Sequence, residues 1–154
     1  MRLWHYELIP VLPRKQLLAQ WRECCAIASN IAKNGTPNHI LVNKILEYPQ
    51  IHFVCYTNKI LNEMSKRSYK VNQGSYERFV ENMNASEIYF PVHDDNIDEF
   101  FNKGKIFPDW HNDRYYEQCF RNLQEKYDCG MFDEKEYDIL HKAYIVHFHF
   151  AKED

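Results

Sequence analysis

Apolar residues recur every three or four positions along most of the chain, which is the spacing of an amphipathic α-helix. The longest such run begins at Pro13, where a missing backbone N–H costs nothing in a first helical turn. Lys33-Asn34-Gly35 is typical of a helix end. The apolar face between them consists of Leu17, Leu18, Trp21, Cys24, Cys25, Ala28 and Ile31. Residues 1–9 are apolar and aromatic and predict an irregular N-terminal lead.

Capping residues and prolines mark the next predicted helices. Thr36-Pro37 predicts the start of a short helix that Pro49 stops, since threonine is a favoured N-cap and proline suits the first helical position. Residues 50–67 form the next predicted helix. Ser75 is the predicted cap of a fourth helix, which reaches about Met83.

Glycines delimit the predicted helices of the second half. Asp95 or Asn96 caps a predicted fifth helix, and Gly104 follows its end. The strong helical pattern of residues 109–127 is followed by Gly130, in the position of a C-terminal glycine.

The last predicted helix opens with a capping box, formed by Asp133 and by Glu136 three residues later. The alternating residues 145–150 predict a short strand or an ordered aromatic extension. No repeat or interdomain linker interrupts the pattern. We therefore expect one compact all-α domain over residues 1–154.

Composition fits this interpretation. The chain has 154 residues, of which 45% are hydrophobic and 27% charged, as in globular rather than disordered proteins. No apolar run approaches the roughly 20 residues of a membrane span, and no signal-peptide core is evident. These features predict a cytoplasmic protein without a membrane partner.

The cysteines predict reduced thiols rather than disulfides or a zinc site. They are odd in number, contain no C-x-x-C pair, and are Cys24, Cys25, Cys55, Cys119 and Cys129. A thiol hydrolase using Cys24 or Cys25 with His39 is one alternative, although adjacent cysteines on a helix usually belong to a core.

The net charge of −3 averages two unlike halves. Residues 1–70 carry ten Lys and Arg against four Glu, a net charge of +6, and residues 71–154 carry a net charge of −9. Such asymmetry favours a basic surface for a polyanion, although charge runs are often only solvated helix faces.

Three constellations carry candidate chemistry. Glu23 lies in the middle of the most basic predicted helix, where it is either a catalytic carboxylate or a surface charge paired with Lys15 or Arg22. His93-Asp94-Asp95 has metal-ligand types, but an aspartate there is also a helix cap. His147-x-His149 lacks evident further zinc ligands and predicts a packed or solvent-facing tail. We expect no metal.

Two segments resemble the pyrimidine-dimer DNA glycosylase/AP lyase family. The first is MRLWHYELIPVLPRKQLLAQWREC, with its helix of the form L-[LM]-A-x-[WY]-R-E. The second is FVCYTNKILNEMSKRSYKV, which ends like the family's middle helix except that Ser68 replaces a glycine. The segments around His39, Val42 and Asn43 and around Asn122, Leu123 and Lys126 look closer to bacterial members.

The resemblance implies a mechanism without a cofactor. The N-terminal amine attacks C1′ of a damaged nucleotide, displaces the base and forms a Schiff base. The carboxylate, here Glu23, stabilises the cationic sugar and assists β-elimination of the 3′ phosphate. An α-amine suits this role, because its ordinary pKa of about 7.7–8.0 leaves a useful fraction neutral at cellular pH.

The sequence departs from the family pattern around these residues. The second residue is Arg2 rather than a small residue, so Met1 is expected to be retained, with Met1 or Arg2 providing the amine. Leu3 stands in place of an arginine, a role that Arg2 can assume, and Gln16 in place of a histidine. Ala26 replaces a phosphate-contacting arginine, while Arg22 and Glu23 are retained.

The sequence thus predicts a repair enzyme acting on damaged double-stranded DNA as a monomer. The predicted catalytic residues are Met1, Arg2 and Glu23, and the predicted DNA contacts are Arg2, Arg14, Lys15, Gln16, Arg22 and Lys33. The competing interpretation is a non-catalytic DNA- or protein-binding module on the same helical scaffold. The acidic second half favours that alternative.

Overall fold

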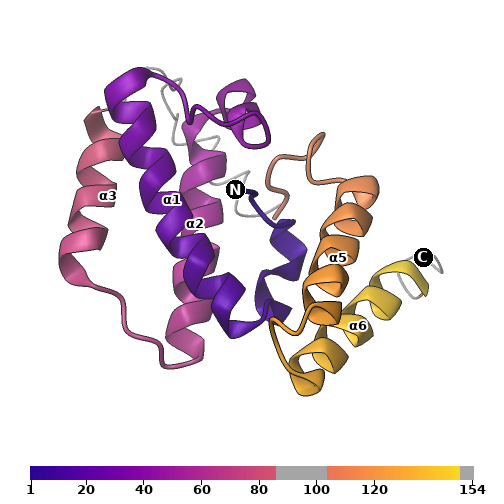
Figure 1. Ribbon diagram of the computed structural model, residues 1–154. Helices are drawn as coiled ribbons and strands as arrows, with labels where there is room; N and C mark the ends of the chain where they lie inside the picture. Colours follow the sequence, from indigo (N-terminus) through magenta and orange to yellow (C-terminus); the bar gives the residue numbers. More distant parts are fainter. Residues whose placement is uncertain (86–103, 150–154) are drawn as a thin grey trace.

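A computed structural model describes residues 1–85 and 104–149 of the chain (Figure 1). All regular secondary structure in this part is helical, which confirms the predicted all-α class. The elements are η1 (Tyr6–Val11) and η2 (Asn43–Glu47), both 3₁₀-helices, and α1 (Arg14–Asn34), α2 (Gln50–Lys66), α3 (Gln73–Ala85), α5 (Asp113–Asp128) and α6 (Glu134–His149). None of these helices is long and apolar enough to span a bilayer.

Helix α1 packs against both α2 and α3, and these three helices form one side of the molecule (Figure 1). Their shared core includes Trp21, Phe53 and Phe79, with ring centroids 5.8 Å apart between Trp21 and Phe79 and 5.9 Å apart between Phe53 and Phe79. Helix α1 ends as predicted: Gly35 has a φ of 77° and donates its N–H to the Ile31 carbonyl.

Helices α5 and α6 form the other side, joined by stacked aromatic pairs (Figure 1). Tyr116 stacks on His147 at 3.8 Å and Phe120 on Tyr144 at 4.0 Å. The predicted glycine at the end of α5 is confirmed, since Gly130 has a φ of 80°. Its N–H and that of Met131 bond back to the Tyr127 and Lys126 carbonyls in a Schellman motif.

The predicted caps are confirmed in one helix and shifted in another. The Asp133 carboxylate accepts from the Glu136 N–H at 2.9 Å and opens α6 as predicted. Helix α3 begins before the predicted cap, because the Asn72 side chain accepts from the Ser75 N–H and places Ser75 inside the helix.

Two predictions of secondary structure are wrong. The helix expected after Thr36-Pro37 is a loop followed by η2, because the Thr36 hydroxyl accepts from the Asn38 N–H and holds a turn instead. Residues 145–149 continue α6 rather than forming a strand or extension, because Tyr144, His147 and Phe148 make one helical face against α5. The helix predicted after residue 95 and the His93-Asp94-Asp95 cluster lie outside the described residues.

The N-terminal lead lies between the two groups of helices (Figure 1). Residues 1–5 form no regular secondary structure, whereas the predicted irregular lead becomes η1 from Tyr6 onward. This 3₁₀-helix contacts both α2 and α6. His147 of α6 adds a polar link, with one ring nitrogen 3.0 Å from the Glu7 carboxylate and the other 2.9 Å from Asp113. The lead therefore has neighbours on both sides.

Candidate functional site

Gln20 of α1 connects the N-terminal backbone to Glu23. Its side chain is fully buried, and its Oε1 accepts the Trp4 N–H at 2.9 Å. Its Nε2 lies 3.0 Å from both the Arg2 carbonyl oxygen and Glu23 Oε2, so each amide hydrogen has an acceptor. One side chain thereby fixes the backbone of the second and fourth residues beside a carboxylate.

Two tyrosines from other helices secure the same stretch of backbone. The Tyr56 hydroxyl of α2 lies 2.7 Å from the Trp4 carbonyl oxygen, and the Tyr115 hydroxyl of α5 donates to the Leu3 carbonyl at 2.5 Å. Burial raises the pKa of both tyrosines, so both remain neutral donors at ordinary pH. Side chains from α1, α2 and α5 thus fix the position of the N-terminal backbone.

We expect Gln20→Ala to lower the free energy of unfolding by about 2–3 kcal/mol, because it leaves the buried Trp4 N–H and Arg2 carbonyl without their partner. Urea denaturation at pH 7 measures this change. The exposed Gln118→Ala is the matched control and should shift stability by less than about 0.5 kcal/mol. Equal stability of the two variants would show that the amide does not hold the lead.

A cavity of about 270 Å³ opens where the chain begins. Its lining brings together the N-terminus, the carboxylate and α5, and consists of Met1, Arg2, Trp4, Glu23, Leu41, Asn122 and Lys126. Glu23 is half-buried, and this burial raises its pKa. The positive N-terminus, the Arg2 backbone N–H and the Gln20 amide counteract the rise by favouring the carboxylate. An amine and a carboxylate therefore share a partly desolvated cavity.

Two further cavities adjoin this one through shared lining residues. One of about 470 Å³ shares Trp4, Glu23 and Lys126 with it, and is otherwise lined by Lys15, Gln16, Leu18, Ala19, Arg22 and Met131. The other, of about 380 Å³, shares Arg2 and Leu41 and is otherwise lined by Ile40, Lys44, Asp109, Trp110, Asn112, Arg114, Tyr115 and Gln118. We call the three together the N-terminal groove.

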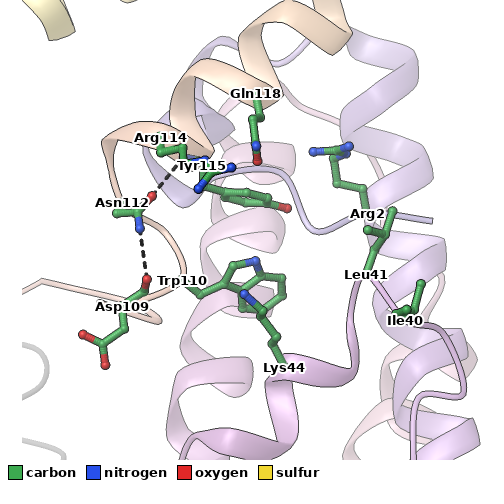
Figure 2. A pocket seen from close by; sticks show the side chains of 10 residues that line it. All are labelled: Arg2, Ile40, Leu41, Lys44, Asp109, Trp110, Asn112, Arg114, Tyr115 and Gln118. Atoms are coloured by element: carbon green, nitrogen blue, oxygen red, sulfur yellow. Dashed lines mark hydrogen bonds between the residues drawn. The ribbon is translucent and has the colours of Figure 1, made fainter.

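Aromatic rings and cations line the cavity of about 380 Å³ at one end of the groove. Figure 2 shows Trp110 and Tyr115 beside each other in this cavity, with Ile40 and Leu41 across from them. The Arg2 guanidinium lies 5.9 Å from the centroids of both the Trp4 and the Tyr115 rings. Such contacts hold the arginine side chain against the wall without neutralising its charge.

The groove is basic although the chain as a whole is acidic. Six lysines and arginines line it, namely Arg2, Lys15, Arg22, Lys44, Arg114 and Lys126, against only two carboxylates, Glu23 and Asp109. Two of these cations, Arg114 and Lys126, come from the acidic half of the sequence. The basic surface therefore combines residues from both halves of the sequence and is not confined to residues 1–70.

The structure brings most of the predicted site residues together and leaves two apart. Met1, Arg2, Lys15, Gln16, Arg22 and Glu23 line the groove. Gln16 is only 6% exposed, and its Oε1 has no hydrogen-bond partner in the described part of the chain. Arg14 lies outside the groove, 5.1 Å from the Tyr69 ring, and Lys33 is exposed in the last turn of α1.

Sequence reasoning missed the residues that complete the groove. Gln20 and Tyr56 hold the lead, while Trp110, Tyr115 and Lys126 line the groove. Asn122 and Lys126 lie four residues apart on α5 and thus on one helical face, which is the signal that their spacing offered.

The environment of Cys24 and Cys25 disfavours a nucleophilic thiol. Cys24 is completely buried, and burial raises the pKa of its thiol and that of Cys25. A protonated thiol is a poor nucleophile, so this environment argues against the thiol hydrolase. Within residues 1–85 and 104–149, no three metal-ligating side chains gather in one place.

These features define an all-helical protein with an N-terminal amine and a carboxylate in a basic groove. A model of the pyrimidine dimer DNA glycosylase family matches residues 1–77, half of the chain, and the chain belongs to this family. The matched part contains the lead, Gln20, Glu23 and Tyr56, whereas Trp110, Tyr115 and Lys126 lie beyond it. Searches of curated proteins and of solved structures gave no match.

Proposed function

We propose that this protein is a DNA repair glycosylase and AP lyase that acts on pyrimidine-dimer or abasic sites in double-stranded DNA. The α-amine at the start of the chain is the nucleophile and Glu23 is the catalytic carboxylate. The observation that carries the proposal is their common cavity, together with the buried Gln20 amide, which bonds both to Glu23 and to the backbone of the lead. Membership of the family supports the same assignment.

The reaction proceeds through covalent bonds to C1′. The neutral amine attacks C1′ as the C1′–N bond to the base breaks, and the base leaves with that electron pair. The attached nitrogen then loses a proton, and its electron pair forms the C1′=N bond as O4′ leaves C1′ and takes up a proton. The opened sugar is thereby held as a protonated Schiff base. Removal of a proton from C2′ then expels the 3′ phosphate with the C3′–O electrons, and water finally releases the amine.

Glu23 has two tasks in this sequence. As a carboxylate it stabilises the positive charge that develops on the sugar and the Schiff base, an interaction that partial desolvation strengthens. In this proposal Glu23 is also the base that removes the C2′ proton, and positioned general bases contribute about 10²–10⁴-fold to rate. The Gln20 amide keeps one carboxylate oxygen in place at 3.0 Å.

The cations of the groove are assigned to phosphates on either side of the lesion. Lys15 and Arg22 line one of the cavities that adjoin the cavity of the amine, and Lys44 and Arg114 line the other. Arg14 and Lys33, at opposite ends of α1, contact flanking phosphates in this proposal. Phosphate contacts orient the duplex without reading its sequence, which suits an enzyme that recognises damage.

Borohydride trapping tests the proposal. Untagged protein, with its N-terminal residue identified by mass spectrometry, is mixed with an abasic duplex and reduced; a covalent protein–DNA adduct is expected, because borohydride converts a Schiff base to a stable amine. UV-irradiated duplex tests base release in the same way. Protein with an acetylated N-terminus is the matched control and should give no adduct.

The alternative binding module makes a different prediction in this assay. It binds the duplex in a salt-sensitive manner, as phosphate contacts require, yet forms no adduct and cleaves no strand. Binding without an adduct would therefore replace the enzymatic assignment with the non-catalytic one. An adduct that persists after acetylation would move the nucleophile to a lysine.

A further inference from the structure

The turn after α1 presents two aliphatic side chains to solvent at the edge of the N-terminal groove. Ile40 is 85% exposed and Leu41 is 47% exposed. Leu41 lines the cavity that holds Met1 and Glu23, and both side chains line the cavity of Trp110 and Tyr115, as Figure 2 shows for the latter. An aliphatic pair exposed beside a basic groove could pack against an apolar part of a charged ligand.

Hydrogen bonds and one buried side chain hold the turn that carries these side chains. The His39 carbonyl accepts the N–H groups of Val42 and Asn43, at 3.0 and 2.9 Å. The Asn43 side chain accepts the His39 N–H at 3.1 Å, and the His39 ring accepts the Leu41 N–H at 3.2 Å. Val42 is completely buried and anchors the turn in the core. The two exposed side chains thus stand on a fixed support.

The positive charge around the turn favours an anionic ligand. Arg2 and Lys44 line the same cavity as the aliphatic pair, so the phosphates of a duplex in the groove would meet cations close to that pair. The apolar parts of such a ligand are its stacked bases. Proteins that bend DNA insert leucine or isoleucine between base steps, at a cost of a few kcal/mol per step.

We propose that Ile40 and Leu41 form a wedge that enters the base stack beside the lesion and opens it toward the N-terminal amine. This inference rests on the proposed function, because it places a DNA duplex in the groove. The wedge is a positioning device: it touches bases rather than the reacting C1′ atom. Only a stacked duplex needs it, since the nucleotides of a single strand are already accessible.

The test compares Ile40→Ser/Leu41→Ser with wild type on matched abasic DNA, double-stranded and single-stranded. We expect the adduct-forming rate on the duplex to fall at least about tenfold more than the rate on the single strand, because about 1.4 kcal/mol of lost unstacking corresponds to a factor of ten. Val146→Ser removes an aliphatic side chain of α6 that is 56% exposed, and it is the control. It should change neither rate.

A second readout follows the base stack directly and requires no catalysis. A 2-aminopurine beside the abasic site brightens when it unstacks, so wild type should increase its fluorescence and the double variant should not. Ile40→Leu/Leu41→Met, which keeps the apolar bulk, should restore the signal. Equal losses on both DNA forms, or no fluorescence change with wild type, would overturn the wedge. Absence of any adduct with fluorescence intact would overturn the enzymatic function alone.

Discussion

Glu23→Gln is expected to slow strand cleavage at an abasic site by about 10²–10⁴-fold, the usual contribution of a positioned acid–base group. The variant keeps the shape of the side chain and an acceptor for the Gln20 amide, but it cannot hold negative charge beside a Schiff base or accept the C2′ proton. Single-turnover cleavage of an end-labelled abasic duplex measures the rate. Glu125→Gln, on an exposed position of α5, is the control and should cleave at the wild-type rate.

The stability of the same variant separates catalysis from folding. Burial raises the pKa of Glu23, so folding favours its protonated form and the ionised carboxylate costs stability at neutral pH. Glutamine removes that cost. We therefore expect the unfolding midpoint of Glu23→Gln at pH 7 to equal or exceed that of wild type. A rate within tenfold of wild type would remove Glu23 from the mechanism.

Local signals account for the parts of the fold that the sequence predicted. The end of α1 at Gly35 and the start of α6 at Asp133 depend on bonds within one turn. The prediction for residues 145–150 was wrong because alternating apolar residues fit a strand as well as a helix. Contact with Tyr116 and Phe120 of α5 decides between them, and this contact lies about thirty residues away in sequence.

The sequence predicted individual candidate residues of the site, but not the contacts that hold them in place. Glu23 is a carboxylate among cations on a predicted helix, and the family resemblance assigned it a role. Gln20 gave no such signal, because a glutamine near an apolar face is ordinary until the N-terminal backbone lies against it. Lys126 was not predicted as a site residue because it belongs to the acidic half of the sequence, although it lines the same cavity as Glu23.

The burial of His5 and His111 predicts a steep loss of stability in mild acid. The two rings are buried 5.1 Å apart, and burial lowers the pKa of His5 to about 4 and that of His111 well below its usual range. Each neutral ring also accepts a backbone hydrogen bond, from the N–H groups of Glu7 and Tyr6 at 3.1 Å. Protonation would replace each acceptor with a donor.

Because both folded pKa values lie below that of an unfolded histidine, about 6.5, the stabilisation is complete above that pH and is lost as the pH falls below it. Two such histidines lower the free energy of unfolding by about 4 kcal/mol between pH 7 and pH 5, with a limiting slope of about 2.7 kcal/mol per pH unit. Urea denaturation across this range measures the slope, and NMR should show two imidazoles that stay neutral at pH 5.5.

His111→Asn keeps an acceptor for the Tyr6 N–H and should halve the slope. A slope below that of one proton in wild type would contradict the prediction. Since both rings bond to the lead that carries the amine, acid that protonates them should release the N-terminus and end adduct formation together with the fold.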